Sequence, residues 1–128
     1  MSTQASLDTP VTDDVDALVG EWLTVPDLAE LIGSDVVRTR ELLRDRQFVG
    51  VRRGERNVIS VPAAFVVDGA VLKGLPGLLT LLADAGYDEN QALRWLFTPD
   101  ETLPGTPVAA LSTHSAREVR RRAQSLAF

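Results

Sequence analysis

The chain has 128 residues with 45% hydrophobic content, enough for one full domain or two small ones around a packed core. It has no cysteine and one histidine, which excludes disulfides and thiolate metal sites, so we expect no metal and no cofactor. No apolar run reaches the roughly 18 residues of a membrane span, and no secretory signal pattern opens the sequence. We therefore expect a soluble, cytoplasmic protein without a membrane partner.

The formal net charge of -5 is unevenly distributed along the chain. Residues 1–35 contain eight Asp and Glu and no Lys or Arg, whereas residues 36–57 contain seven Arg and only three acids. A bound polyanion responds to the local field more than to the total charge, so an acidic balance does not exclude nucleic acid as a partner. The sequence predicts one basic surface inside an acidic protein.

Residues 1–20 are polar and acidic, and we predict that they form a disordered tail. Thr9 precedes a proline and Thr12 precedes two aspartates, so both are candidate phosphorylation sites, although the composition favours a plain solvated terminus. A phosphate would add about 1.5 to 2 negative charges, which would compete with DNA for the arginines.

Residues 21–65 are predicted to form a winged helix-turn-helix. Thr24 is the expected N-cap of a first helix, which Gly33 ends, and Ser34 or Asp35 caps the second helix. Trp22 either staples the first helix or contacts DNA, and the pattern favours the staple.

The second predicted helix has two contrasting sides. Four residues share one side at helical spacing and are expected to be buried: Val36, Thr39, Leu42 and Leu43. Val37, Glu41 and Arg44 project from the opposite side, flanked by Arg38 and Arg40. This pattern is typical of a recognition helix that enters a major groove about 12 Å wide.

Two apolar runs, residues 48–51 and 58–61, are separated by a basic turn. We predict a hairpin whose tip carries three arginines and touches the phosphate backbone or the minor groove as a wing. The residues predicted to contact DNA are Thr24, Ser34, Arg38, Arg40, Arg44, Arg52, Arg53 and Arg56.

Residues 66–128 are predicted to form a hairpin at Asp68-Gly69 followed by helices over 75–85, 88–97 and 108–111. A last helix starts at Thr113 or Ser115, and Trp95 is expected in the core. The predicted fold class is mainly α with small β, a winged helix-turn-helix followed by a C-terminal hairpin and helical domain.

Catalytic patterns are missing from the sequence. The serines have one histidine to share and no nucleophile elbow, and no glycine-rich loop could cradle a phosphate. We therefore expect a protein that is not an enzyme.

The stretch that carries the winged-helix pattern begins LTVPDLAELIG and continues through VRTRELLRDRQFVGVRRGERNVISVP. It resembles the excisionase and MerR-like winged helix-turn-helix domains. Over nearly its whole length the chain resembles a small actinobacterial family of winged-helix DNA-binding proteins known as Ser/Thr protein kinase substrates. The residues that carry this resemblance are VLKGLPGLLTLLADAGY, RWLFTPD and HSAREVRRRAQSLAF. The resemblance implies DNA binding and control by phosphorylation in the N-terminal segment, a role that we assign first to Thr9 and second to Thr12.

The C-terminal half separately resembles the toxin-binding domain of Xre, MbcA and ParS type antitoxins. The residues involved are Ala92 to Leu96, Pro99, Asp100, Leu103, Gly105, Pro107 and Arg117 to Val119. This resemblance implies a fold used for dimerisation and for holding a protein partner.

These patterns lead to two hypotheses of different classes. The first is a DNA-binding regulator or nucleoid-associated protein that acts on double-stranded DNA, is controlled by a Ser/Thr protein kinase and binds as a homodimer. The alternative is a protein-protein adaptor or antitoxin-like module whose C-terminal helices hold a partner. An adaptor would not bind duplex DNA even at low salt.

Overall fold

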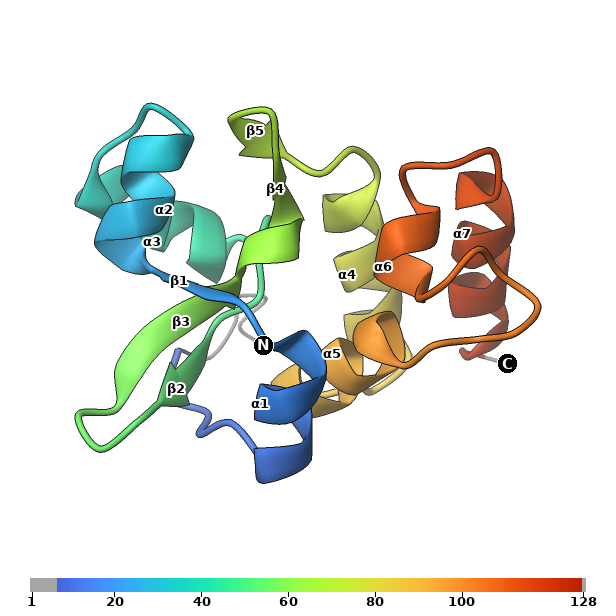
Figure 1. The fold of residues 1–128 in the computed structure, drawn as a ribbon, viewed down its shortest axis with the longest axis horizontal. Helices are drawn as coiled ribbons and strands as arrows, with labels where there is room; N and C mark the ends of the chain where they lie inside the picture. The colour runs from blue at the N-terminus through green and yellow to red at the C-terminus, as the bar shows by residue number, and fades with distance from the viewer. Residues whose placement is uncertain (1–6, 128) are drawn as a thin grey trace.

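The computed structural model describes residues 7–127 of the chain. Its first part consists of α1 (Asp13–Val19), β1 (Trp22–Thr24), α2 (Val25–Leu31), α3 (Val36–Arg44), β2 (Val51–Arg53), β3 (Val58–Pro62) and the 3-10 helix η1 (Ala63–Phe65). Its second part consists of β4 (Val66–Val67), β5 (Ala70–Val71), α4 (Leu75–Asp84), α5 (Glu89–Phe97), α6 (Pro107–Ala110) and α7 (Ala116–Ser125). A winged helix at one end of the molecule leads to α6 and α7 at the other (Figure 1), which confirms the predicted fold class.

The winged helix is built on a three-stranded antiparallel sheet with β3 between β1 and β2. Leu23 lies opposite Val61, and Arg52 lies opposite Ile59. The first strand, β1, was not expected from the sequence. It begins at Trp22, which pairs with Pro62, and the predicted role of Trp22 as a helix staple stays a prediction.

The helix-turn-helix follows the predicted capping pattern. The Thr24 hydroxyl accepts a hydrogen bond from the Asp27 amide at 3.3 Å, and Gly33 takes a positive φ of 70° after α2. Of the two candidates for the second cap, Asp35 fills the position, because its carboxylate accepts from the Arg38 amide at 2.7 Å.

The wing is shorter than predicted. Arg46 takes a positive φ of 61° after α3, and Phe48 is then fully buried, so the strand begins only at Val51. The turn between β2 and β3 spans residues 54–57, in which Gly54 and Asn57 have φ of 75° and 52°. The prediction of three arginines at the tip is therefore wrong, because Arg52 and Arg53 lie within β2 and only Arg56 lies in the turn.

The prediction of a disordered tail through residue 20 is also wrong for the part that the structure describes; residues 1–6 lie outside it. Pro10 forms a parallel bridge to Arg52, and the Asn90 side chain binds the Pro10 carbonyl at 2.9 Å and the Thr12 amide at 3.0 Å. Val15 of α1 is fully buried. Leu7, Val11 and Val19 also pack against the core. Burial of these apolar side chains and satisfaction of the nearby backbone groups explain why the acidic segment folds onto the protein.

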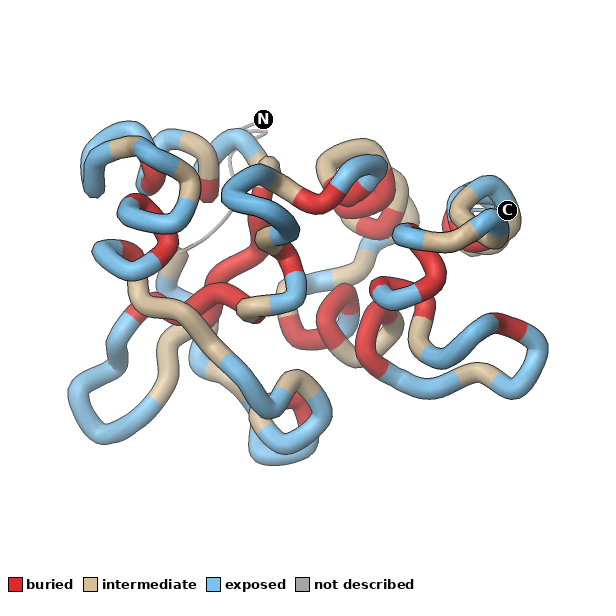
Figure 2. Tube along the Cα trace, turned by 45° about the horizontal axis from the view of Figure 1, so that its top comes forward, coloured by how far each residue is buried: buried red, intermediate tan, exposed pale blue. Residues whose placement is uncertain are grey.

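One hydrophobic core runs through both parts of the described chain. The buried leucines of α4 are the predicted ones, Leu75, Leu78, Leu79 and Leu82. The rings of Phe65 and Phe97 lie 5.9 Å apart and join η1 to α5. Figure 2 shows buried segments, in red, continuing from the winged helix into the C-terminal helices.

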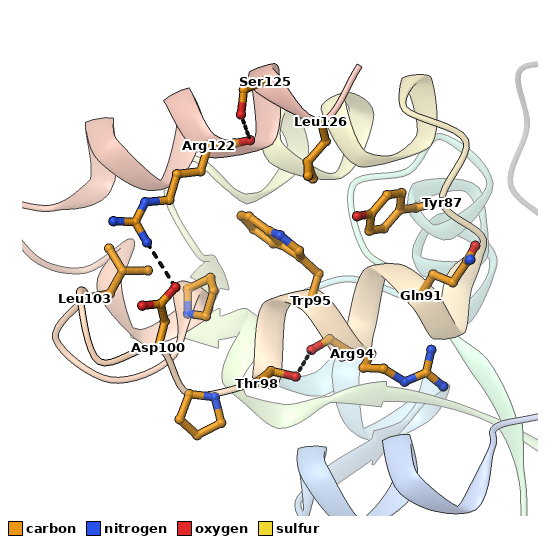
Figure 3. A pocket seen from close by; sticks show the side chains of 12 residues that line it. Tyr87, Gln91, Arg94, Trp95, Thr98, Asp100, Leu103, Arg122, Ser125 and Leu126 are labelled. Carbon is orange, nitrogen blue, oxygen red and sulfur yellow. Dashed lines mark hydrogen bonds and ion pairs between the residues drawn. The ribbon is translucent and has the colours of Figure 1, made fainter. Parts of the chain in front are cut away.

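Trp95 departs from its predicted place in the core, because it is only half-buried. Its ring points into a hollow of about 560 Å³ between α5, α7 and the loop that follows α5 (Figure 3). Tyr87 and Leu126 flank the ring on one side, and Arg122 pairs with Asp100 at 3.0 Å on the other.

Candidate nucleic-acid interface

The outer face of α3 combines an exposed apolar side chain with charged side chains. Arg40 and Glu41 lie three and four residues after Val37, and Arg44 lies four and three residues after them, so the four residues share this face. The Val37 side chain is 70% exposed, although it is apolar. On the opposite face Thr39 and Leu43 are fully buried, and the Thr39 hydroxyl donates to the Asp35 carbonyl at 2.7 Å.

The arginines of α3 differ in what they contact. Arg38 pairs with Glu41 at 3.1 Å, and both side chains are more than half exposed, so this bond is weak in water. Arg40 and Arg44 are exposed and form no ion pair or side-chain hydrogen bond within residues 7–127. Two guanidinium groups on α3 are therefore available to a bound anion.

The two arginines of β2 are held by the N-terminal segment. The Arg52 guanidinium donates to the Leu7 carbonyl at 3.0 Å, to the Asn57 carbonyl at 2.9 Å and to Asp8 at 3.3 Å. Arg53 lies over the Trp22 ring, 4.8 Å from its centroid, and forms two hydrogen bonds with Asp16 of α1, at 2.9 and 3.3 Å. Both guanidinium groups are therefore occupied by carboxylates within the protein.

The same segment is fastened to α5. Arg94 binds Asp14 at 2.6 Å, and hydrogen bonds from Arg94 and Thr12 hold the pKa of Asp14 well below its usual range. The Thr9 hydroxyl donates to Glu89 at 3.2 Å, and the Thr9 carbonyl accepts from the Arg52 amide at 2.8 Å. Residues 7–19 thus bridge the wing and the C-terminal helices.

The remaining predicted contact residues lie around these groups. Arg56 is exposed in the turn and has no ion pair among the described residues. Thr24 and Ser34 are half-buried; the Thr24 hydroxyl caps α2, and the Ser34 amide donates to the Ala29 carbonyl at 2.8 Å. The α2–α3 pair and the tip of the wing occupy the same end of the molecule, away from α6 and α7 (Figure 1).

Residues 7–127 contain neither a cluster of metal ligands nor a helix that could cross a membrane. No group of three or more His, Asp or Glu side chains in this part of the chain could hold a metal ion. Within the same residues, no helix has both the length and the apolar character that crossing a bilayer requires.

Comparison with known proteins shows similarity over both parts of the chain. A family model described as the wHTH domain of DNA-binding protein Rv2175c matches residues 8–66. A second model, described as the Rv2175c C-terminal domain of unknown function, matches residues 72–127. The chain is 41% identical over 131 residues to DNA-binding protein Rv2175c of Mycobacterium tuberculosis, covering 93% of this chain and 89% of that protein. The chain belongs to the Rv2175c family.

The fold of the Rv2175c family is shared as well as its sequence. An NMR structure of Rv2175c superposes with a TM-score of 0.81 at 36% identity, covering 99% of this chain and 92% of that one. The predicted control by a kinase and the predicted antitoxin-like partner stay predictions.

The sequence did not indicate which arginines of this Rv2175c-family protein are already paired. Asp8 and Asp16 are separated from Arg52 and Arg53 by 44 and 37 positions, and no local pattern connects them. The one available signal was Val15, an apolar residue among aspartates at helical spacing from Val19.

Proposed function

We propose that this protein binds double-stranded DNA as a regulator or nucleoid-associated protein of the cytoplasm, with α3 in the major groove and the β2–β3 turn on the neighbouring backbone. The observation that carries the proposal is the pair of exposed, unpaired arginines on the outer face of α3, Arg40 and Arg44. An exposed guanidinium reads guanine with two hydrogen bonds or grips a phosphate. The 41% identical relative is itself named a DNA-binding protein, which supports the same conclusion.

The roles of the other residues follow from what each one contacts. Arg38 binds a flanking phosphate at the expense of its exposed pair with Glu41, and Arg56 binds the backbone from the wing. Thr24 and Ser34 stand at the two helix starts, where backbone amides face a phosphate. Arg52 and Arg53 contact DNA only after the aspartates of the N-terminal segment have moved away.

Phosphorylation of the N-terminal segment by a Ser/Thr kinase is part of this proposal. A phosphate on Thr9 would stand beside Glu89 and next to the backbone of Arg52, where it adds negative charge at the base of the wing. Thr12 is the more exposed of the two, and its hydroxyl donates to Asp14 at 2.6 Å. Either phosphate would reduce the attraction of the wing for DNA.

A homodimer is also part of the proposal, because one winged helix with few base contacts binds weakly by itself and a symmetric pair doubles them.

The proposal is tested by fluorescence anisotropy with a random-sequence duplex over a range of salt concentrations. We expect binding at low salt that weakens steadily as salt rises, because bound phosphates release counterions. Absence of binding at low salt would contradict the proposal and favour an adaptor role.

A further inference from the structure

A second hollow lies where the hairpin of β4 and β5 meets the start of α4 and the connection from α6 to α7. Its volume is about 670 Å³, within the range of about 300 to 1,000 Å³ that is usual for small-molecule sites. Its apolar lining residues are Val67, Val71, Leu72, Leu78, Leu111 and Ala116. The Val67 side chain is 44% exposed, so part of this apolar surface faces solvent.

The charged residues that line this groove all have the same sign. Lys73, Arg117 and Arg120 stand among the lining residues, which include no Asp or Glu. None of the three forms an ion pair within residues 7–127. An apolar surface bordered by three unpaired cations is complementary to a molecule that has an apolar body and an anionic head.

The Arg120 guanidinium lies close to α4. A Cβ atom added at Gly77 of α4 would lie 3.0 Å from the Arg120 Nη1 atom, so the glycine leaves room for the guanidinium against α4. Arg120 also lines the groove.

The hollow around Trp95 differs in this respect. Its Arg122 is already bound by Asp100 at 3.0 Å and by Glu118 at 3.1 Å. Hydrogen bonds from Arg121 and then Arg122 lower the pKa of Glu118, which keeps that carboxylate charged. The charged groups at the Trp95 hollow are paired with one another, whereas the three cations of the groove form no ion pair within residues 7–127.

We propose that the groove between the β4–β5 hairpin and α7 binds a small amphipathic anion, a carboxylate carried on an apolar chain or ring. The head lies between Arg117 and Arg120, and the apolar body lies on Val67, Val71 and Ala116, which are exposed or half-buried in the groove. This site is separate from the DNA face and goes beyond the proposed function.

Binding is tested on the full chain by NMR with 15N-labelled protein and laurate below its micelle concentration. Dodecyltrimethylammonium, which has the same chain and a cationic head, and acetate, which has the same head without the chain, are the matched probes. We expect saturable shifts for laurate at residues 66–73 and 111–117. Each matched probe should bind more weakly than laurate by about tenfold or more. Equal binding of the cationic probe or of acetate would overturn the proposal.

Variants separate the two parts of the site. Arg117→Gln with Arg120→Gln should weaken laurate binding by about tenfold or more, and Val67→Ser should weaken it with the arginines intact. Arg121→Gln, on the same helix but outside the groove, is the control and should leave binding unchanged; circular dichroism verifies the fold of each. Unchanged binding in the double arginine variant would overturn the proposal. Binding of an acidic amphipathic peptide but not of laurate would overturn the proposal in favour of a protein partner. Self-association that the double arginine variant loses would overturn it in favour of a second copy of the chain.

Discussion

The seven arginines between residues 38 and 56 form one group in the sequence, but six of them fall into three kinds of side chain in the structure. Arg40, Arg44 and Arg56 are exposed and unpaired among the described residues, Arg38 has an exposed partner, and Arg52 and Arg53 are bound by distant aspartates. Exposure of Arg40 and Arg44 on α3 could be predicted because helical periodicity places them opposite the buried Thr39 and Leu43. The prediction that Val36 is buried is wrong, because this residue of the first turn is 39% exposed. Pairing could not, because it depends on tertiary contacts with α1.

The free arginines of α3 give the first prediction. Replacing Arg40 and Arg44 with alanine should lower the slope of log affinity against log salt by about 2, because two phosphate or base contacts are lost. The melting temperature should not change, because both side chains are exposed and unpaired. Arg120→Ala with Arg121→Ala removes the same charge at the far end and should leave the slope unchanged. Equal slopes in all three proteins would contradict the assignment.

Val37 gives the second prediction. A large apolar side chain that is 70% exposed beside two free arginines suits contact with the methyl group of thymine. A duplex in which uracil replaces every thymine should bind about fourfold more weakly, the value of one buried methyl group. Val37→Ala should bind both duplexes alike in anisotropy titrations. If the variant still distinguishes the two duplexes, Val37 is not the residue that contacts the methyl group.

At the scale of elements, the helices of the structure match the sequence prediction more closely than the strands do. Capping by Thr24, Asp35 and Asp88 and the leucine spacing of α4 are local features that a sequence displays. β1 has three residues and exists through pairing with β3, which lies about forty positions further along the chain. The order of the acidic segment could not be predicted for the same reason, since it comes from contacts with β2 and α5.

The N-terminal segment gives the third prediction. Asp8→Asn with Asp16→Asn should tighten DNA binding and steepen the salt slope by about 2, because Arg52 and Arg53 are released. Asp68→Asn with Asp84→Asn changes the net charge equally on other elements and serves as the control. The same gain in both double variants would mean that net charge, and not the release of the wing arginines, is responsible.

Thr9 gives the fourth prediction. Thr9→Glu should weaken duplex binding several-fold, because it adds negative charge next to β2, close to the Glu89 carboxylate that the Thr9 hydroxyl contacts at 3.2 Å. Thr9→Gln has a similar size without the charge, so it isolates the electrostatic effect. Equal binding by the two variants in anisotropy titrations would count against phosphate control at this position.

At the scale of the whole molecule, the acidic N-terminal segment and the basic wing are in contact rather than far apart. The acidic segment lies on the wing, and the exposed arginines of α3 lie at the same end (Figure 1). The order of winged helix and helical domain could be predicted from the sequence, whereas the continuous core could not. Phe65 and Phe97 are far apart in the sequence and come together only in the folded chain. Trp95 is half-buried at the edge of the core, because its ring faces a hollow.

The proposed function requires that α3 and the tip of the wing together form the surface that contacts DNA. NMR with 15N-labelled protein and a short duplex measures this directly. We predict that amide shifts concentrate in residues 36–44 and 54–57 and leave α6 and α7 unchanged. Shifts centred on the C-terminal helices, or none at low salt, would contradict the account.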